Sequence, residues 1–133
     1  MITAIHNRRR GFTLVEIMLV VAIIVLLAAI AIPSWTRGRK RSQATRILND
    51  LRVIDHALDQ WAIDNNKSSG QEATLVELRE YFKPTDTPLY DRGVDLFNNP
   101  YGPFQADVTP KVNVDTFAAL EEVAPAEFWS PYR

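Results

Sequence analysis

The chain has 133 residues, no cysteine and a formal net charge of −1, so it has room for one small domain without disulfide bonds. It contains no phosphate-binding loop, no zinc-ligand pattern and no evident acid–base pair, so we expect no enzymatic activity, no cofactor and no metal site. The charge is unevenly distributed along the chain. Residues 37–46 carry five basic residues and no acid, whereas residues 47–133 carry seven basic and fifteen acidic residues, a balance of −8.

Residues 1–11 form a short basic segment in front of the apolar part of the chain. Arg8, Arg9 and Arg10 lie directly before a long apolar run, and basic residues beside a membrane span tend to remain on the cytoplasmic side. We interpret these arginines as a topology signal, and we do not expect the protein to bind nucleic acid. Residues 1–11 are therefore predicted to be a leader peptide.

The next segment, residues 12–34, is long and apolar enough to cross a membrane. From Phe12 to Ile32 there are 21 residues, and the only charge among them is Glu16. As an α-helix this run is about 31 Å long, close to the thickness of the bilayer hydrocarbon. Because proline lacks an N–H group and its ring crowds the preceding turn, we expect a kink or break of the helix at Pro33.

Glu16 is the unusual residue of this segment, because a carboxylate in hydrocarbon is costly unless it has a partner. No basic residue lies between Gly11 and Arg37. Glu16 could reach the lipid headgroups from its place near the helix start, or it could bind a proton. If the chain is cut after Gly11, Glu16 could instead pair with the new α-amino group on Phe12, of the same or a neighbouring subunit.

The residues from Arg10 to Glu16, Arg-Gly-Phe-Thr-Leu-Val-Glu, precede an apolar run and resemble the type III signal of type IV pilins and pseudopilins. The resemblance implies that a membrane-embedded aspartyl peptidase cleaves after Gly11 and that the amino group of Phe12 is then methylated. It also implies that Glu16 acts in the assembly of a filament, made of copies of this chain or of other pilins, at an assembly platform in the inner membrane. The head would then lie in the periplasm or outside the cell.

Two other interpretations remain open. Ala29-Ile30-Ala31 has the form of an ordinary signal-peptidase site, and cleavage there would release a soluble protein, although the preceding apolar region is longer than usual and contains a charge. The chain could also be a single-pass membrane-anchored binding module that does not polymerise. Glu16 argues against this module, since a simple anchor needs no acid within its membrane-spanning helix.

Trp35 and the basic residues that follow it are typical of a membrane-interface anchor. These basic residues are Arg37, Arg39, Lys40 and Arg41. DNA binding is the alternative, but no aromatic residues alternate with the charges to stack on bases. We therefore expect this stretch to contact lipid headgroups.

Residues 35–64 are predicted to form the amphipathic half of the same long helix. Apolar residues recur there at spacings of three and four and form one stripe. The stripe consists of Ala44, Ile47, Leu51, Ile54, Leu58 and Trp61. We expect it to pack against the protein's own head, and turn-forming residues from Asn65 to Gly70 should end the helix.

Residues 65–133 are predicted to form a small globular head, so that the fold class is α+β. Thr74 and Glu77 have the spacing of a capping box and predict a short helix. Further along, apolar runs alternate with turn residues and predict a small antiparallel sheet. The runs are residues 89–90, 94–97 and 104–108.

The end of the head is predicted to contain one more helical turn and a packed tail. Asp115 is expected to cap a helix over residues 116–123. Residues 128–132 are too aromatic to be left in water, so we expect them to pack onto the head.

The stretch from Asp95 to Gly102 resembles the Asp-Pro-Trp-Gly-x-Pro-Tyr segment of major type II secretion pseudopilins, which favours the pseudopilin branch without excluding a pilus. Calcium binds in a later Asp- and Gly-rich loop of those pseudopilins, and no such loop follows Val108. Asp91 and Asp95 lie in an oxygen-rich loop that could hold a hard cation, although turn chemistry explains the same residues.

Overall fold

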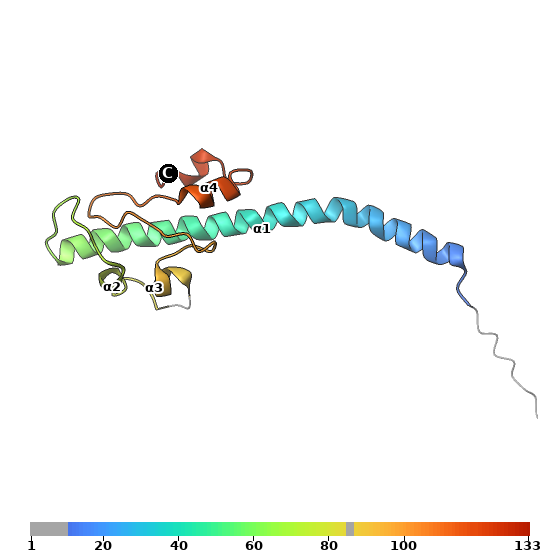
Figure 1. The fold of residues 1–133 in the computed structure, drawn as a ribbon, viewed down its shortest axis with the longest axis horizontal. Helices are drawn as coiled ribbons and strands as arrows, with labels where there is room; N and C mark the ends of the chain where they lie inside the picture. The colour runs from blue at the N-terminus through green and yellow to red at the C-terminus, as the bar shows by residue number, and fades with distance from the viewer. Residues whose placement is uncertain (1–10, 85–86) are drawn as a thin grey trace, which may run out of the picture. The chain divides into compact units, whose positions relative to one another are not determined.

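The longest element is the helix α1, Leu14–Asp64, whose 51 residues belong to both compact units of the chain, residues 1–36 and 37–133 (Figure 1). The computed structural model describes residues 11–84 and 87–133, so the expected leader arginines lie outside the described residues. Within the described part, α1 confirms the predicted long N-terminal helix.

In the first unit, α1 carries apolar side chains on all sides. The large apolar residues from Leu14 to Ile32 are between 49% and 75% exposed, so the described chain does not bury them. A helix that is apolar all round needs an apolar environment, such as lipid or neighbouring helices. By its length and composition, α1 is the one described helix that can cross a membrane.

The helix continues through Pro33 without interruption. The hydroxyl of Thr36 donates a hydrogen bond to the carbonyl oxygen of Pro33 at 3.0 Å. Proline cannot donate a hydrogen bond to the carbonyl of Ala29, so the helix lacks one backbone bond at this point. The structure therefore shows α1 unbroken at Pro33, and the expected weakness of this turn stays a prediction.

In the second unit, one face of α1 forms the centre of the hydrophobic core. Eight of its residues are buried, and they include the whole predicted stripe: Ala44, Ile47, Leu48, Leu51, Ile54, Ala57, Leu58 and Trp61. Trp129 and Leu120 from the head are fully buried in the same cluster. The prediction that the stripe packs against the protein's own head is therefore confirmed.

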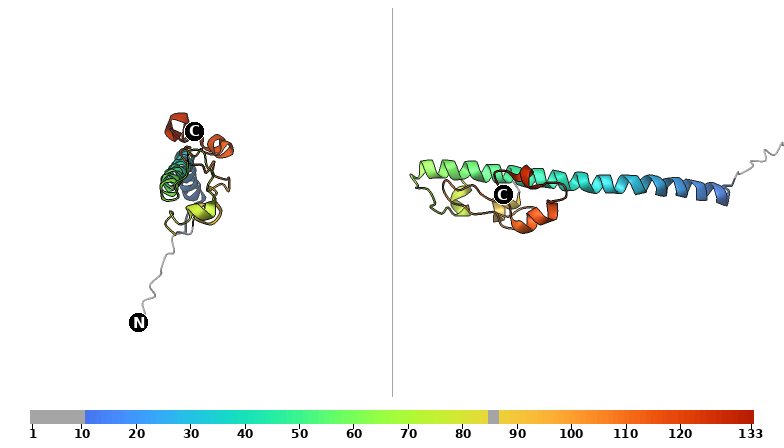
Figure 2. Two further views of the ribbon diagram at one scale, coloured as in Figure 1. Left: turned by 90° about the vertical axis from the view of Figure 1, so that its left-hand side faces the viewer. Right: turned by 90° about the horizontal axis from the view of Figure 1, so that it is seen from above.

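The head consists of short helical elements joined by irregular segments. They are α2 (Leu75–Leu78), α3 (Pro88–Arg92), α4 (Val114–Leu120) and the 3-10 helix η1 (Ala126–Trp129). In the second unit, α2 and α3 lie on one side of α1 and α4 lies on the other (Figure 1), and the view along the helix in Figure 2 agrees. The head thus covers α1 from two sides.

The caps of the short helices follow side-chain chemistry that is partly readable from the sequence. The hydroxyl of Thr74 accepts a hydrogen bond from the N–H of Glu77, whose carboxylate accepts the N–H of Thr74 at 2.8 Å, so the predicted capping box is confirmed. The prediction that Asp115 caps α4 is wrong, because the side chain of Asn113 accepts the Asp115 N–H and caps the helix. Asp115 instead lies in the first turn, where a negative charge favours the helix dipole.

The predicted antiparallel sheet is wrong, since the described residues form only isolated β-bridges. The runs 94–97 and 104–108 do not pair with each other, because Val94 bridges Pro100 in the intervening turn, and Gln105 bridges Glu72 and Val108. A proline has no N–H group to donate, so the bridge at Pro100 is not extended into a β-ladder on that side. Leu89 and Tyr90, expected in a strand, lie in α3, which begins after the N-cap Thr87 with a proline at its first position.

The aromatic tail is anchored as predicted. The Trp129 side chain is fully buried, and its indole N–H donates to the carbonyl oxygen of Ala124 at 3.0 Å. Its ring meets that of Phe128 edge to face at 5.2 Å between centroids. Tyr132 is also buried, and its carbonyl oxygen accepts the N–H of Val112 at 2.7 Å.

Candidate processing and assembly site

Gly11 and Phe12 lie directly before α1, outside regular secondary structure. Phe12 is 81% exposed, so its ring has no packing role within the described chain. A Cβ atom placed on Gly11 would meet no heavy atom within 4 Å. The described fold therefore gives no steric reason for glycine at position 11, and the need for it must be sought in a partner that approaches the backbone.

Thr13 and Glu16 form a reciprocal cap at the start of α1. The N–H of Thr13 donates to Glu16 Oε2 at 3.4 Å, and the N–H of Glu16 donates to Thr13 Oγ1 at 3.2 Å. These two bonds satisfy backbone donors that the first helical turn leaves free. The carboxylate also lies at the positive end of the helix dipole, which favours its charge.

This capping box gives Glu16 a partner that the sequence analysis missed. The Thr-x-x-Glu spacing from Thr13 to Glu16 is the same signal that identified α2, so it could have been read from the sequence. The cap holds the carboxylate next to the residue that would carry a new α-amino group if the chain were cut after Gly11. Glu16 is therefore positioned at the start of the helix, with its carboxylate directed back toward Thr13.

The basic residues after Trp35 form what we call the basic collar: Arg37, Arg39, Lys40 and Arg41. The Trp35 side chain is 78% exposed. In the second unit, the Glu122 carboxylate forms ion pairs with Arg37 Nε and with Lys40 Nζ, each at 3.4 Å. The structure thus connects the collar to the head through one carboxylate, a contact that the sequence did not predict.

Two tyrosine hydroxyls connect the head to α1. The Tyr101 hydroxyl donates to Asp50 Oδ2 at 3.0 Å, and the Tyr132 hydroxyl donates to Asp55 Oδ2 at 3.2 Å. Burial raises the pKa of Tyr101 well above its usual range, and the neighbouring Asp50 carboxylate raises it further. Burial also raises the pKa of Asp50, against the lowering effect of its bond from Tyr101. These contacts are structural and hold the head in register on the helix.

Asp95 lies in a tight turn and uses both carboxylate oxygens in hydrogen bonds. Oδ1 accepts the N–H groups of Phe97 at 2.8 Å and Asn99 at 2.9 Å, and Oδ2 accepts the hydroxyl of Thr116. Asp91 lies in α3 and is exposed. Among the described residues, no three His, Cys, Asp or Glu side chains gather as metal ligands would. Asp95 therefore both shapes the turn and connects it to Thr116 of α4.

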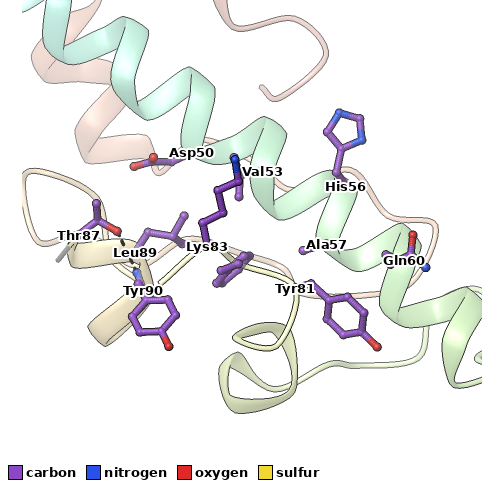
Figure 3. A pocket seen from close by; sticks show the side chains of 11 residues that line it. Asp50, Val53, His56, Ala57, Gln60, Tyr81, Lys83, Thr87, Leu89 and Tyr90 are labelled. Carbon is purple, nitrogen blue, oxygen red and sulfur yellow. Dashed lines mark hydrogen bonds between the residues drawn. The ribbon is translucent and has the colours of Figure 1, made fainter. Parts of the chain in front are cut away.

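A groove of about 460 Å³ lies between α1 and the segments around α2 and α3 (Figure 3). Its lining is mainly apolar and aromatic, with Tyr81, Leu89 and Tyr90 on the head side. Asp50 and His56 also line it, but the Asp50 carboxylate is bonded to Tyr101.

Comparison with known proteins points to one family. Residues 6–32 match the family model of the prokaryotic N-terminal methylation motif. The chain is 35% identical over 81 residues to the type II secretion system core protein G of Pectobacterium carotovorum, an alignment that covers 61% of this chain and 51% of the relative. It is 38% identical over 69 residues to the type IV wide pilus major component PilA4 of Thermus thermophilus, covering 52% and 53%.

A third relative is matched over more of its length. The core protein G of Klebsiella michiganensis is 26% identical over 126 residues, covering 90% of this chain and 89% of the relative. The alignments with the first two relatives span about half of the length of each. No solved structure matches the chain. The chain thus carries the N-terminal methylation motif and is similar to type II secretion pseudopilins and to type IV pilins, and the core protein G relatives favour the pseudopilin branch.

Proposed function

We propose that the protein is a structural subunit of a type II secretion pseudopilus or a type IV pilus-like filament. It is made as a prepilin, cleaved after Gly11 and methylated on the amino group of Phe12. The observation that carries this proposal is the methylation motif over residues 6–32, joined to a helix whose apolar side chains are exposed all round. Those side chains need a membrane before assembly and neighbouring helices afterwards.

The proposed partners follow from this life cycle. A prepilin peptidase and methyltransferase acts at Gly11 and Phe12, the inner membrane holds the subunit, and an assembly platform adds it to a filament of like chains or other pilins. The head lies in the periplasm or outside the cell. Trp35 and the basic collar anchor the helix at the outer headgroup layer of the inner membrane. The protein has no catalytic role of its own, as its relatives are named as a secretion-system core protein and a pilus component.

The Glu16 carboxylate is proposed to neutralise the Phe12 amino group of an adjacent subunit during assembly. Opposite charges attract strongly in a low-dielectric core, and an unpaired one is penalised, so correct axial register is favoured. The Thr13 cap holds Glu16 at the helix start, where such a pair would form. A membrane-anchored module that never polymerises would need this residue for the helix cap but would not need its negative charge.

Pro33 is proposed to let α1 stretch near residues 28–33 when the subunit leaves the bilayer, because one helical hydrogen bond is already missing there. A filament density map in which this segment is straight, unbroken α-helix would contradict this part of the proposal.

Two measurements test the proposed function. Mass spectrometry of the membrane protein should give a mature chain that begins with methylated Phe12, whereas cleavage by ordinary signal peptidase would give one that begins at Ile32. Electron microscopy should show filaments that are lost from cells without this protein and return when the wild-type chain is supplied. Correctly processed protein with no effect on any filament would favour the non-polymerising anchor.

A further inference from the structure

The basic collar and Glu122 together suggest how the subunit recognises the membrane surface. The collar follows the apolar segment after only a few residues, and four positive charges lie within five positions of α1. In the second unit, only Arg37 and Lys40 of these four have an ion pair among the described residues, and both share Glu122. Arg39 and Arg41 therefore keep their charge available.

The helical geometry places Arg39 apart from the two paired charges, whereas Arg41 lies about 40° from Arg37, on their side of the helix. At about 100° per residue, Arg39 points about 200° away from Arg37, whereas Lys40 lies only about 60° from Arg37. Glu122 thus covers one side of the helix, and Arg39 faces the other. The two ion pairs join exposed groups at 3.4 Å, with 57% of the Glu122 side chain accessible. Such pairs contribute little stability and exchange readily with another anion.

We propose that the basic collar binds the phosphate groups of anionic lipid headgroups, and that Glu122 limits this binding by occupying Arg37 and Lys40 from within the chain. Lipid phosphates suit the collar because a guanidinium forms paired hydrogen bonds with phosphate oxygens. This competition sets how strongly the collar binds anionic lipid, since displacing Glu122 frees the charges of Arg37 and Lys40 for lipid phosphates. The inference rests on the proposed function, which places the collar at a membrane surface.

The test uses the full chain reconstituted in nanodiscs that contain equal amounts of phosphatidylglycerol and phosphatidylcholine. Electron spin resonance with spin-labelled lipids measures how strongly each lipid associates with the protein. The wild-type chain should prefer phosphatidylglycerol, and the preference should weaken with added salt. Arg39→Gln should lower the preference, and Glu122→Gln should raise it about two- to fivefold.

Glu121→Gln is the matched control, because Glu121 is the exposed neighbour of Glu122, carries the same charge and has no ion pair within the described residues. Circular dichroism melting checks that each variant is folded. A Glu122→Gln chain that behaves like Glu121→Gln, or an Arg39→Gln chain that behaves like wild type, would overturn the proposal. A duplex oligonucleotide is also added to discs made of phosphatidylcholine alone. If it binds the wild-type chain but not the Arg39→Gln chain, the collar binds nucleic acid, and the proposal is overturned.

The lipid measurement is made on chains in discs and does not depend on filament formation. Filament yield in cells is therefore scored separately for the wild-type chain. Filaments without any lipid preference would refute only the present inference, whereas a lipid preference that responds to Glu122 in a protein that forms no filament would refute only the proposed function.

Discussion

The hydroxyl of Tyr101 donates a hydrogen bond to the Asp50 carboxylate at 3.0 Å and so joins the irregular part of the head to α1. The tyrosine side chain is buried, with 6% of it exposed. If a half-buried carboxylate loses such a donor, it remains partly shielded from water but has no hydrogen bond to compensate for that lost hydration. The contact is therefore expected to stabilise the head and to fix its register on the helix.

Replacing Tyr101 by phenylalanine should destabilise the head by about 1–3 kcal/mol, because the ring stays but the Asp50 carboxylate loses its donor. The full chain in detergent micelles is melted and followed by near-ultraviolet circular dichroism. Tyr90→Phe is the matched control, since its ring also packs against the core but its hydroxyl makes no hydrogen bond among the described residues. Equal melting temperatures for the two variants would show that the Asp50 contact contributes nothing.

Alkaline pH should weaken the head through the same tyrosine. Burial and the Asp50 carboxylate raise the pKa of Tyr101 above that of an exposed tyrosine. The folded state therefore retains a proton that the unfolded state loses above about pH 10. Stability from this group is fully present below that pH and falls above it, by about 1.4 kcal/mol per pH unit.

The measurement is the pH dependence of the melting temperature between pH 8 and 11, for wild type and for Tyr101→Phe. Tyr132 contributes in the same direction, because burial also raises its pKa and Asp55 raises it further. The Tyr101→Phe chain should thus keep a smaller alkaline slope. A slope equal to that of the wild type would mean that Tyr101 titrates alike in the folded and unfolded states.

The long helix was predictable because its signals repeat along the sequence. The unbroken apolar run indicates a helix in an apolar environment, and the spacing of residues such as Ile47 and Leu51 indicates one buried helix face. The α2 cap at Thr74 and Glu77 was predictable for a similar reason, since two side chains close in sequence satisfy each other.

The irregular head could not be predicted in the same way, because long-range packing decides it. The run from Leu89 to Tyr90 is apolar and short, and it is helical between the N-cap Thr87 and the C-cap Gly93. Short apolar runs fit a strand or a helix equally well. The pairs Tyr101–Asp50 and Glu122–Lys40 join residues 51 and 82 positions apart, and no local pattern encodes such contacts.

Substituting Gly11 by valine should block processing, because the peptidase must approach a backbone that carries no side chain. The substitution should not disturb the fold, since a Cβ atom at Gly11 meets nothing within 4 Å. Gly38→Val is the matched control, as Gly38 lies in α1 and also faces open space. Immunoblots of membrane fractions should show only unprocessed precursor for Gly11→Val. Normal mature protein from this variant would rule out the assigned cleavage site.

Glu16 has two roles that can be separated by substitution. In the capping box it acts as a hydrogen-bond acceptor for the N–H of Thr13, and a neutral glutamine can do the same. In the proposed filament it acts as a negative charge against the Phe12 amino group of the adjacent subunit, and glutamine cannot do this. Glu16→Gln therefore removes the charge and keeps the cap, whereas Glu16→Ala removes both.

Both variants should be processed and should remain in the membrane, because a neutral residue lowers the cost of inserting the helix. Both should lose filaments, since the neighbouring amino group would then be buried without a partner. Thr13→Val, which removes the capping hydroxyl but keeps the carboxylate, is the reverse control and should retain most of the filament yield. Filament yield is compared with processing and membrane level in the same cells. If Glu16→Gln forms filaments like the wild type while Glu16→Ala does not, the cap and not the charge pair explains Glu16.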